Sequence, residues 1–336
     1  MSLNFAQWLP LVEKAVECRR PLFDEQHTNA LRLYNGFTEG WPELVIDLYA
    51  DTVVIFDYSE PPQPPDRWIP LADWLGIQIP WIKSVLLKVR NSKNIAEKRG
   101  ILLSGSHLAS KVCENGVWYA LDLTLNQDAS LYLDTRFLRI WLREHALEKD
   151  VLNTFAYTGS LGIAAAAAGA RKVVQSDLNQ RFLAVARQSA TLNGIPEKRC
   201  QIQTGDFFSQ VANFKRSSAL FDIVIADPPF FSSTSRGQVN LVGQSRRVIN
   251  KLRPLVRDDG WLVSINNALF VSGADYLRDL EDLCKDGYLS LETTLPVPED
   301  FTGYAETRRE NWPADPAPFN HPTKIAILRV TRKSPI

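Results

Sequence analysis

Three of the aspartates in the second half of this 336-residue chain lie at or just after the end of a short apolar run: Asp177, Asp206 and Asp227. If the apolar runs are parallel strands of one sheet, the three carboxylates lie at its carboxyl edge, where open α/β sheets bind ligands. A carboxylate at the end of the second strand of a βαβ unit is placed to accept both hydroxyls of a ribose. The pattern predicts a site for a ribose-bearing ligand, although each aspartate could instead cap the next helix.

Residues 151–162, which precede Asp177, are typical of a strand, a tight turn and the start of a helix. Gly159 and Gly162 permit the sharp turn and a close approach of helix to sheet. A dinucleotide fingerprint begins with a glycine that lets backbone amides approach a pyrophosphate, and here Tyr157 takes that position. This favours a ribose-bearing ligand without phosphates, such as S-adenosyl-L-methionine. The alternative is an ordinary α/β turn with an incidental aspartate.

The most specific motif is Ile225-Ala226-Asp227-Pro228-Pro229-Phe230-Phe231. Two prolines fix the backbone directly after a strand, so the Asp227 carboxylate and the Pro228 carbonyl point in set directions. Both groups can accept hydrogens from an amino group of a base and so orient its nitrogen toward a methyl sulfonium. Phe230 offers a face on which a base can stack. The structural alternative is a rigid turn with two buried phenylalanines.

Residues 83–99 carry a local excess of positive charge, with Glu97 as the one acid among the basic residues Lys83, Lys88, Arg90, Lys93, Lys98 and Arg99. We expect Lys88, Arg90 and Lys93 to contact RNA phosphates. The alternative is a solvated loop, since most charge runs are solvated.

The whole-chain composition is that of a globular protein without net charge, since Lys+Arg and Asp+Glu both number 38. Charge alone does not favour a nucleic-acid partner, although a local basic patch could supply one. There is no long uncharged apolar span and no signal-peptide pattern, so we expect a soluble cytoplasmic protein. The four cysteines are scattered without a C-x-x-C pair, so no metal site is expected.

The elements that must position these residues fall into two groups. An amphipathic helix over 3–19 precedes predicted strands at 31–34, 44–49, 52–58, 84–89 and 117–123, with a short helix near 66–76. After a boundary near 125–130, Asp134 is the predicted N-cap of a helix reaching about 146. Strands and helices then alternate at 151–155, 161–169, 172–176, 179–193, 200–203, 222–226, 241–256, 260–265, 273–285, 288–296 and 324–330.

This alternation predicts an α/β fold with a Rossmann-like, doubly wound sheet. We expect three parts: an N-terminal helix in 1–27, a small α+β domain in 28–125 that could bind RNA, and a catalytic domain in 126–336. Residues 296–322 form a long irregular stretch, which we interpret as a substrate-side loop. A lid of purely structural use is the alternative.

The chain resembles the class I S-adenosylmethionine-dependent methyltransferases, whose sheet has seven strands. Their motifs are matched at residues 151–162, 173–179, 204–207 and 225–231. The chain also resembles the bacterial large-subunit (23S) rRNA methyltransferases of the I and K types, and this resemblance spans about residues 28–330. It is carried by residues 31–35, 46–51, 132–136 and 155–159. The I-type enzymes carry an N-terminal PUA domain. Only about 27 residues precede the resemblance here, so we expect that domain to be absent.

The resemblance implies a set of cofactor-binding residues: Tyr132, Asp134, Arg136, Asn153, Phe155, Tyr157, Thr158, Gly159, Asp177, Leu178, Asp206, Phe207 and Asp227. Tyr132, Asp134 and Arg136 would flank the methionine end, with Arg136 a candidate partner for its carboxylate. Asp206 could accept from the adenine amino group, with Phe207 beside the ring. Phe231 and Asn266 are expected on the substrate side.

The segment Val263-Ser264-Ile265-Asn266-Asn267 bears on the acceptor atom. I-type cytosine-C5 enzymes have a Ser-Cys segment here, because carbon 5 of cytosine needs a thiolate adduct. No cysteine lies in any motif of this chain, and the Asn-Asn pair resembles the K-type guanine-N7 enzyme. We therefore expect direct methyl transfer to a purine nitrogen of rRNA. The alternatives are cytosine-C5 methylation through another cysteine, protein side-chain methylation, and RNA binding without catalysis.

Overall fold

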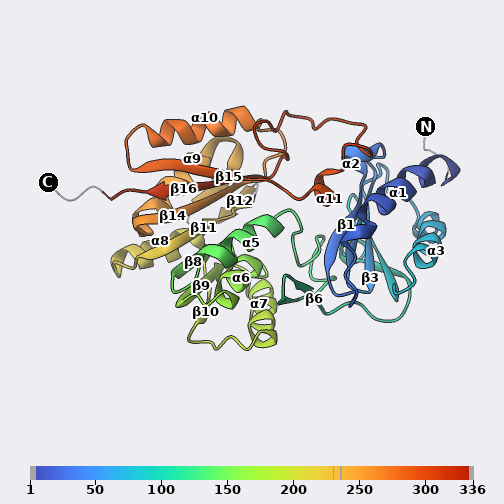
Figure 1. Cartoon of the computed structure of the whole chain (residues 1–336), viewed down its shortest axis with the longest axis horizontal. Helices are drawn as coiled ribbons and strands as arrows, with labels where there is room; N and C mark the ends of the chain where they lie inside the picture. The colour runs from blue at the N-terminus through green and yellow to red at the C-terminus, as the bar shows by residue number, and fades with distance from the viewer. Residues whose placement is uncertain (1–4, 230, 235–236, 333–336) are drawn as a thin grey trace. The chain divides into compact units, whose positions relative to one another are not determined.

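The computed structural model describes residues 5–229, 231–234 and 237–332 of the chain (Figure 1). The chain divides into two compact units. The first unit comprises Met1–Asp134 together with Pro298–Asn311, and the second comprises Thr135–Val297 together with Trp312–Ile336. The change of unit lies at 134/135, a few residues after the predicted boundary. The return of 298–311 to the first unit was not predicted.

The first unit is built on a five-stranded sheet in the order β1-β2-β3-β4-β5. Its strands are β1 (Ala30–Asn35), β2 (Leu44–Tyr49), β3 (Thr52–Asp57), β4 (Ser84–Val89) and β5 (Ile101–Ser104). Strands β3 and β4 pair in parallel, and the other neighbours are antiparallel. A two-stranded sheet pairs β6 (Lys111–Glu114) with β7 (Val117–Ala120). The predicted strand 117–123 is therefore shorter than expected.

Two helices share one apolar core with this sheet. Helix α1 (Phe5–Arg19) contributes Trp8, Val12 and Val16. The helix expected near 66–76 is a 3₁₀ turn, η2 (Pro65–Trp68), followed by α3 (Ile69–Gln78). The shorter helices of this unit are η1 (Arg20–Leu22), α2 (Gly36–Glu39), α4 (Ile95–Arg99) and α11 (Glu299–Thr302). The apolar faces read from the sequence thus form the core of an α+β unit.

The second unit is a seven-stranded sheet in the order β10-β9-β8-β11-β14-β16-β15. Its strands are β8 (Asp150–Thr154), β9 (Lys172–Asp177), β10 (Cys200–Thr204), β11 (Phe221–Ala226), β14 (Val256–Asn266), β15 (Leu289–Leu295) and β16 (Lys324–Val330). The first five strands in the sheet order are parallel, and β16 runs antiparallel to both of its neighbours. The predicted doubly wound, Rossmann-like sheet is confirmed.

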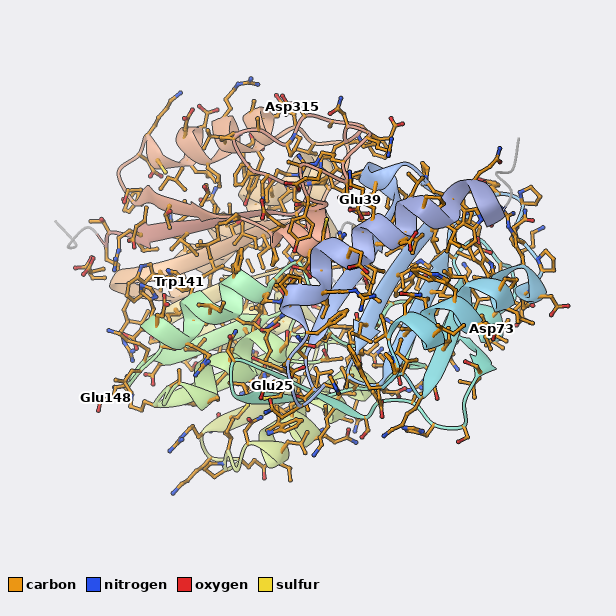
Figure 2. All side chains as sticks on the ribbon, turned by 45° about the vertical axis from the view of Figure 1, so that its right-hand side comes forward. Glu25, Glu39, Asp73, Trp141, Glu148 and Asp315 are labelled. Atoms are coloured by element: carbon orange, nitrogen blue, oxygen red, sulfur yellow. The ribbon has the colours of Figure 1, made fainter. Side chains whose placement is uncertain are left out.

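Helices connect these strands: α5 (Arg136–His145), α6 (Ser160–Ala167), α7 (Gln180–Leu192), α8 (Phe207–Arg216), α9 (Leu241–Leu252) and α10 (Gly273–Cys284). A 3₁₀ turn, η3 (Arg253–Leu255), follows α9, and a hairpin pairs β12 (Phe231–Thr234) with β13 (Gly237–Asn240). Trp141 of α5, labelled in Figure 2, meets Trp261 of β14 edge to face at 5.6 Å between ring centroids. The expected N-cap of α5 is wrong, because Thr135 holds that position and makes no side-chain cap bond.

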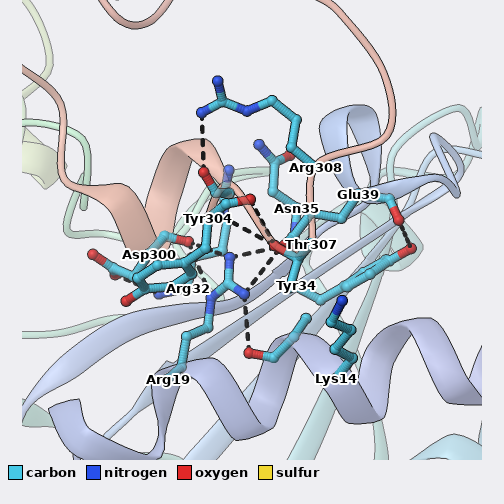
Figure 3. A network of polar contacts seen from close by, with 12 residues as sticks. Lys14, Arg19, Arg32, Tyr34, Asn35, Glu39, Asp300, Tyr304, Thr307 and Arg308 are labelled. Atoms are coloured by element: carbon cyan, nitrogen blue, oxygen red, sulfur yellow. Dashed lines mark hydrogen bonds and ion pairs between the residues drawn. The ribbon is translucent and has the colours of Figure 1, made fainter.

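A buried ion pair holds 298–311 in the first unit (Figure 3). Arg19 donates from both terminal nitrogens to the two Glu39 carboxylate oxygens, at 3.0 and 3.1 Å. Its Nε and Nη2 also donate to the Asp300 carbonyl, at 3.2 and 2.7 Å. The Thr307 hydroxyl donates to Glu39 as well. Both charged side chains are almost fully buried, so the added bonds are needed to offset their desolvation.

Backbone groups extend this attachment along the segment. The Thr38 hydroxyl donates to the Thr302 carbonyl at 3.0 Å, and the Arg309 amide donates to the Thr38 carbonyl at 2.7 Å. Asn35 donates from Nδ2 to the Phe301 carbonyl at 3.0 Å. These bonds favour the structural alternative for this part of the predicted substrate-side loop.

Arg19→Ala should detach this segment. The substitution leaves the Glu39 carboxylate buried without its cation, which costs about 3–5 kcal/mol. Amide hydrogen exchange of residues 299–309 should become markedly faster. Arg20→Ala is the matched control, because its ion-pair partner Glu17 is 55% exposed and such pairs contribute only about 0–1 kcal/mol. Equal exchange in the two variants would show that the ion pair does not hold the segment.

Candidate cofactor and substrate site

A strained turn connects β8 to α6. Phe155, Tyr157 and Gly159 have φ angles of 54°, 51° and 79°, a region that non-glycine residues rarely adopt. A side chain at Gly159 would place its Cβ 2.6 Å from Ala186 Cβ and from Gln175 Nε2. Glycine is therefore required here by both backbone conformation and space. Strain of this kind is common at ligand sites.

Asp177 ends β9 and is tied to this turn. Its Oδ2 accepts a hydrogen bond from the Tyr157 amide at 2.9 Å, and its Oδ1 accepts from the Asn179 amide at 2.8 Å. Burial raises the pKa of the Asp177 carboxyl, and these backbone bonds partly offset that rise. A carboxylate has about four acceptor positions, so a carboxylate fixed in this way still has capacity for ribose hydroxyls.

The parallel pairing of β10 with β9 brings the turn after β10 next to the end of β9. Thr204 pairs with Asp177 across β10 and β9, and the Gly205 amide donates to the Asp177 carbonyl at 2.9 Å. Asp206 follows directly and caps α8, accepting from the Ser209 amide at 3.1 Å. The capping alternative for Asp206 is thus realised, and its predicted contact with adenine stays a prediction.

Apolar groups surround the same turns. Phe207 is buried and stacks on Phe155 at 4.5 Å between ring centroids. Leu178, in the turn after Asp177, is 60% exposed. An exposed leucine beside a fixed carboxylate suits a ligand with both an apolar ring and a polar sugar, because such ligands need a few polar groups within an apolar lining.

The Asn153 side chain supports the turn from within the protein. It is buried, and its Nδ2 donates to Gln175 Oε1 at 2.8 Å. Gln175 in turn donates from Nε2 to the Gly159 carbonyl at 2.9 Å. This arrangement favours a positioning role for Asn153 over direct cofactor contact. Sequence reasoning missed Gln175, although a glutamine inside an apolar strand was the available signal. Thr158 is also buried.

The residues predicted for the acceptor side follow or end β11 and β14, two paired strands in which Ala226 and Ser264 are register partners. After Ala226 come Asp227, which is half-buried, and Pro228, which is buried. Strand β14 continues two residues beyond Ser264 to Asn266. Phe230 and the side chain of Phe231 lie outside the described residues.

Asn266 presents a hydrogen-bond donor at this edge. Its Oδ1 accepts from the Ala268 amide at 2.9 Å, which fixes the orientation of the side-chain amide. Its Nδ2 is buried and has no hydrogen-bond partner among the described residues. Lys324 holds the same turn through a bond of 3.0 Å to the Ala268 carbonyl. A buried, unpaired donor is costly, and it suits an acceptor atom on a substrate.

The methionine-end residues fall in different units. Tyr132 and Asp134 belong to the first unit, and Arg136 begins α5 in the second. The Tyr132 hydroxyl donates to Asp128 Oδ2 at 3.1 Å. The predicted role of these three residues stays a prediction.

The structure corrects the prediction for Lys88. Its side chain is fully buried, and Nζ donates to the Arg99 carbonyl at 2.7 Å and the Asn126 carbonyl at 2.9 Å. Burial lowers the pKa of this ammonium to about 8. Lys88 is wrong as an RNA contact because it is enclosed. Arg90 is paired with Asp128 at 2.6 Å, and Lys93 is exposed.

The described part of the chain offers neither a metal cluster nor a membrane-spanning helix. No group of three or more His, Cys, Asp or Glu side chains there could hold a metal ion. None of the described helices is both long enough and apolar enough to cross a membrane.

A family model described as S-adenosylmethionine-dependent methyltransferase matches residues 32–302. The chain therefore belongs to the S-adenosylmethionine-dependent methyltransferases, and S-adenosyl-L-methionine is its methyl donor. The predicted enzyme class and cofactor are confirmed. The fixed carboxylate of Asp177 and the exposed Leu178 fit the sugar and the ring of this cofactor.

Two curated relatives are similar over most of this chain. It is 27% identical over 320 residues to the "putative ribosomal RNA large subunit methyltransferase YwbD" of Bacillus subtilis, covering 90% of this chain and 76% of that protein. It is 31% identical over 248 residues to ribosomal RNA large subunit methyltransferase I of Aeromonas salmonicida, covering 73% of this chain and 61% of that protein. The chain thus spans about three-fifths of the I-type enzyme.

Solved structures show the same fold. A "putative methyltransferase complexed with SAH" has a TM-score of 0.82 at 22% identity, covering 98% of this chain and 83% of that chain. A "putative sam-dependent methyltransferase" from Streptococcus mutans has a TM-score of 0.81 at 21% identity, covering 98% and 82%. At this identity the likeness establishes the fold alone.

Asp177→Ala should remove most of the affinity for S-adenosylmethionine and for its demethylated product. Each hydrogen bond to a charged group contributes about 1.5–3 kcal/mol, so affinity should fall roughly 10- to 150-fold per ribose bond lost. Calorimetry with both ligands measures this, and NAD should not bind to either form. Glu281→Ala, a change at an exposed position of α10, is the control. Unchanged affinity in Asp177→Ala would remove this carboxylate from the site.

Proposed function

We propose that the enzyme methylates large-subunit rRNA, at a guanine nitrogen, by direct transfer. The observation that supports this proposal is the edge where the paired strands β11 and β14 end. Asp227 and Pro228 follow β11, Asn266 ends β14, and none of the cysteines lies in these segments. The two relatives described above are both named as large-subunit rRNA methyltransferases, which supports the substrate class.

Asn266 bears on the choice of base. Guanine presents two neighbouring acceptors on one edge, O6 and N7. Asn266 Nδ2 would donate a hydrogen bond to O6 and leave N7 free to accept the methyl group. The lone pair of N7 needs no activation by proton removal. Bound S-adenosylmethionine supplies the electrophilic methyl group. If the acceptor is an amino group instead, the Asp227 carboxylate and the Pro228 carbonyl would accept its hydrogens.

The cysteines argue against the cytosine-C5 alternative. Cys200 opens β10, so it lies at the amino end of a parallel strand, opposite the ligand edge of the sheet. Burial raises the pKa of its thiol to about 11. Cys284 is the last residue of α10, and burial raises its pKa as well. Neither thiol has the lowered pKa that a nucleophilic cysteine needs.

The first unit is the proposed RNA-binding unit. Lys93 remains an exposed cation of the basic stretch, whereas Lys88 is withdrawn from it and Arg90 is neutralised by Asp128. The electrostatic contribution of this stretch to RNA binding is therefore smaller than the sequence suggested.

Asn266→Asp should lower kcat/KM for rRNA about 10-fold or more, because the donor is replaced by an acceptor of the same shape. Asn267→Asp is the matched control, since the neighbouring residue is exposed.

Asp227→Ala should reduce turnover about 10²- to 10⁴-fold. The assay follows methyl transfer to 23S rRNA prepared from a deletion strain, with mass spectrometry of the nucleosides. The absence of any methylated guanosine would overturn the proposed acceptor.

A variant with all four cysteines changed to Ala or Ser should keep its methyl-transfer activity, because direct transfer needs no thiolate. Circular dichroism and cofactor calorimetry establish that the variant is folded. A folded, cofactor-binding variant without activity would revive the cytosine-C5 alternative. A denaturation-resistant adduct between the native enzyme and RNA containing 5-fluorocytosine would do the same.

A further inference from the structure

The first unit contains a pocket of about 600 Å³. Its walls come from the loop after η1, the β2–β3 turn, the loop before β4 and the residues leading into β6. The side chains that matter chemically are His27, Trp81, Lys83, His107, Lys111 and Trp118. The volume is within the range of about 300–1,000 Å³ usual for small-ligand sites. The residues proposed for the methyl-transfer site, Asp177, Asp227 and Asn266, belong to the second unit, and none of them lines this pocket.

An aromatic pair forms one wall. The rings of His27 and Trp81 are parallel within 6° and 4.0 Å apart between centroids. Phe23 meets Trp81 edge to face at 5.0 Å and supports it. Both rings of the pair are half-buried, so part of each remains open to the pocket. Flat aromatic surfaces of this kind stack on nucleobases irrespective of sequence.

The same pair carries polar atoms that lack partners. Trp81 Nε1 and His27 Nδ1 are buried and make no hydrogen bond within the part of the chain that the structure describes. Trp81 Nε1 can only donate, so an acceptor atom of a bound group would satisfy it. His27 and Ala50, both in the pocket wall, have positive φ angles of 55° and 53°. Such strain is common at binding sites.

The charges at the pocket favour an anion. Asp51, the one acid among the described lining residues, accepts from Lys83 Nζ at 3.1 Å and from His107 Nε2 at 3.2 Å. Burial by itself raises the pKa of Asp51, but the bonds from Lys83 and His107 outweigh it and hold the pKa low. The Lys111 ammonium lies 4.5 Å from the centre of the Trp118 ring. The described lining residues thus carry two lysines and one aspartate, which leaves an excess of one positive charge.

We propose that this pocket binds one unstacked nucleotide of a single-stranded RNA segment. Its base would stack on the His27–Trp81 pair, and its sugar–phosphate would accept from Trp81 Nε1 and lie near Lys83 and Lys111. The rim is open to a continuous strand, since Lys83 is 64% exposed. The proposal rests on RNA being the substrate, and it adds a contact that holds the RNA on the first unit.

The test is anisotropy of fluorescein-labelled ten-nucleotide single-stranded RNAs, titrated with the full-length protein saturated with S-adenosylhomocysteine. Trp81→Phe keeps a ring but removes the donor, and His27→Ala removes half of the stack. Each should weaken binding about 5-fold or more, the lower end of the effect of one stacked base. Lys111→Ala should weaken it and reduce its salt dependence. Cofactor affinity should be unchanged in all three.

Matched controls separate the pocket from general effects. Trp74→Phe changes a half-buried tryptophan of α3 that does not line the pocket, and Lys198→Ala removes an exposed charge in the second unit. Both controls should bind RNA like the parent protein. Pocket variants that match these controls would overturn the proposal. So would a free nucleoside monophosphate that competes as tightly as the ten-nucleotide RNA, because the pocket would then take free nucleotides.

The binding assay needs no methyl transfer, so its result tests the pocket separately from the proposed function. Loss of RNA affinity in Trp81→Phe supports the pocket even if rRNA is never methylated. Methylation of rRNA with an unchanged KM in Trp81→Phe would retain the proposed function and reject the pocket.

Discussion

The parallel pairing of β8 with both β9 and β11 is the constraint on which the catalytic unit depends. Because these strands share one direction, the turns that follow them leave the sheet at the same edge. Register partners Thr154 and Ser176, and Thr154 and Ala226, place the ends of the three strands level with one another. Asp177, which ends β9, and Asp227, which follows β11, therefore lie at the same edge of the sheet on the two strands that flank β8, although they are 50 positions apart in the sequence.

A buried amide network makes that edge rigid. Asn153 binds Gln175, and Gln175 binds the carbonyl of Gly159, so the first turn is held to β8 and β9 at once. Any side chain at Gly159 or Gly162 would collide with Gln175. The network thus explains why small residues follow the strand, and why the strained backbone at Tyr157 persists. It also brings the Tyr157 amide to Asp177, which fixes the carboxylate without a second side chain.

Buried cations are satisfied in two ways in the described part of the chain. In the first, Arg19 and Glu39 neutralise each other and take further bonds from 298–311. In the second, Lys324 is buried beside Asn266 with backbone carbonyls as partners, and burial lowers the pKa of its ammonium to about 8. Both cations serve to hold a segment that comes late in the chain. Some charged side chains of this protein therefore have a structural role. The number of basic residues in the sequence overstates how many are available to contact RNA.

Local pattern in the sequence determined the alternating elements of the second unit and the residues that end its strands. Apolar runs bounded by glycine, proline and aspartate are short-range signals, so β16 and the position of Asp177 could be predicted closely. Tertiary structure alone decided which charges are buried. Lys88 looked like part of an RNA-binding stretch, yet its ammonium bonds a carbonyl 38 residues away. Arg19 likewise bonds Asp300, 281 residues away. No local pattern encodes such pairings, because they exist only once distant segments pack together.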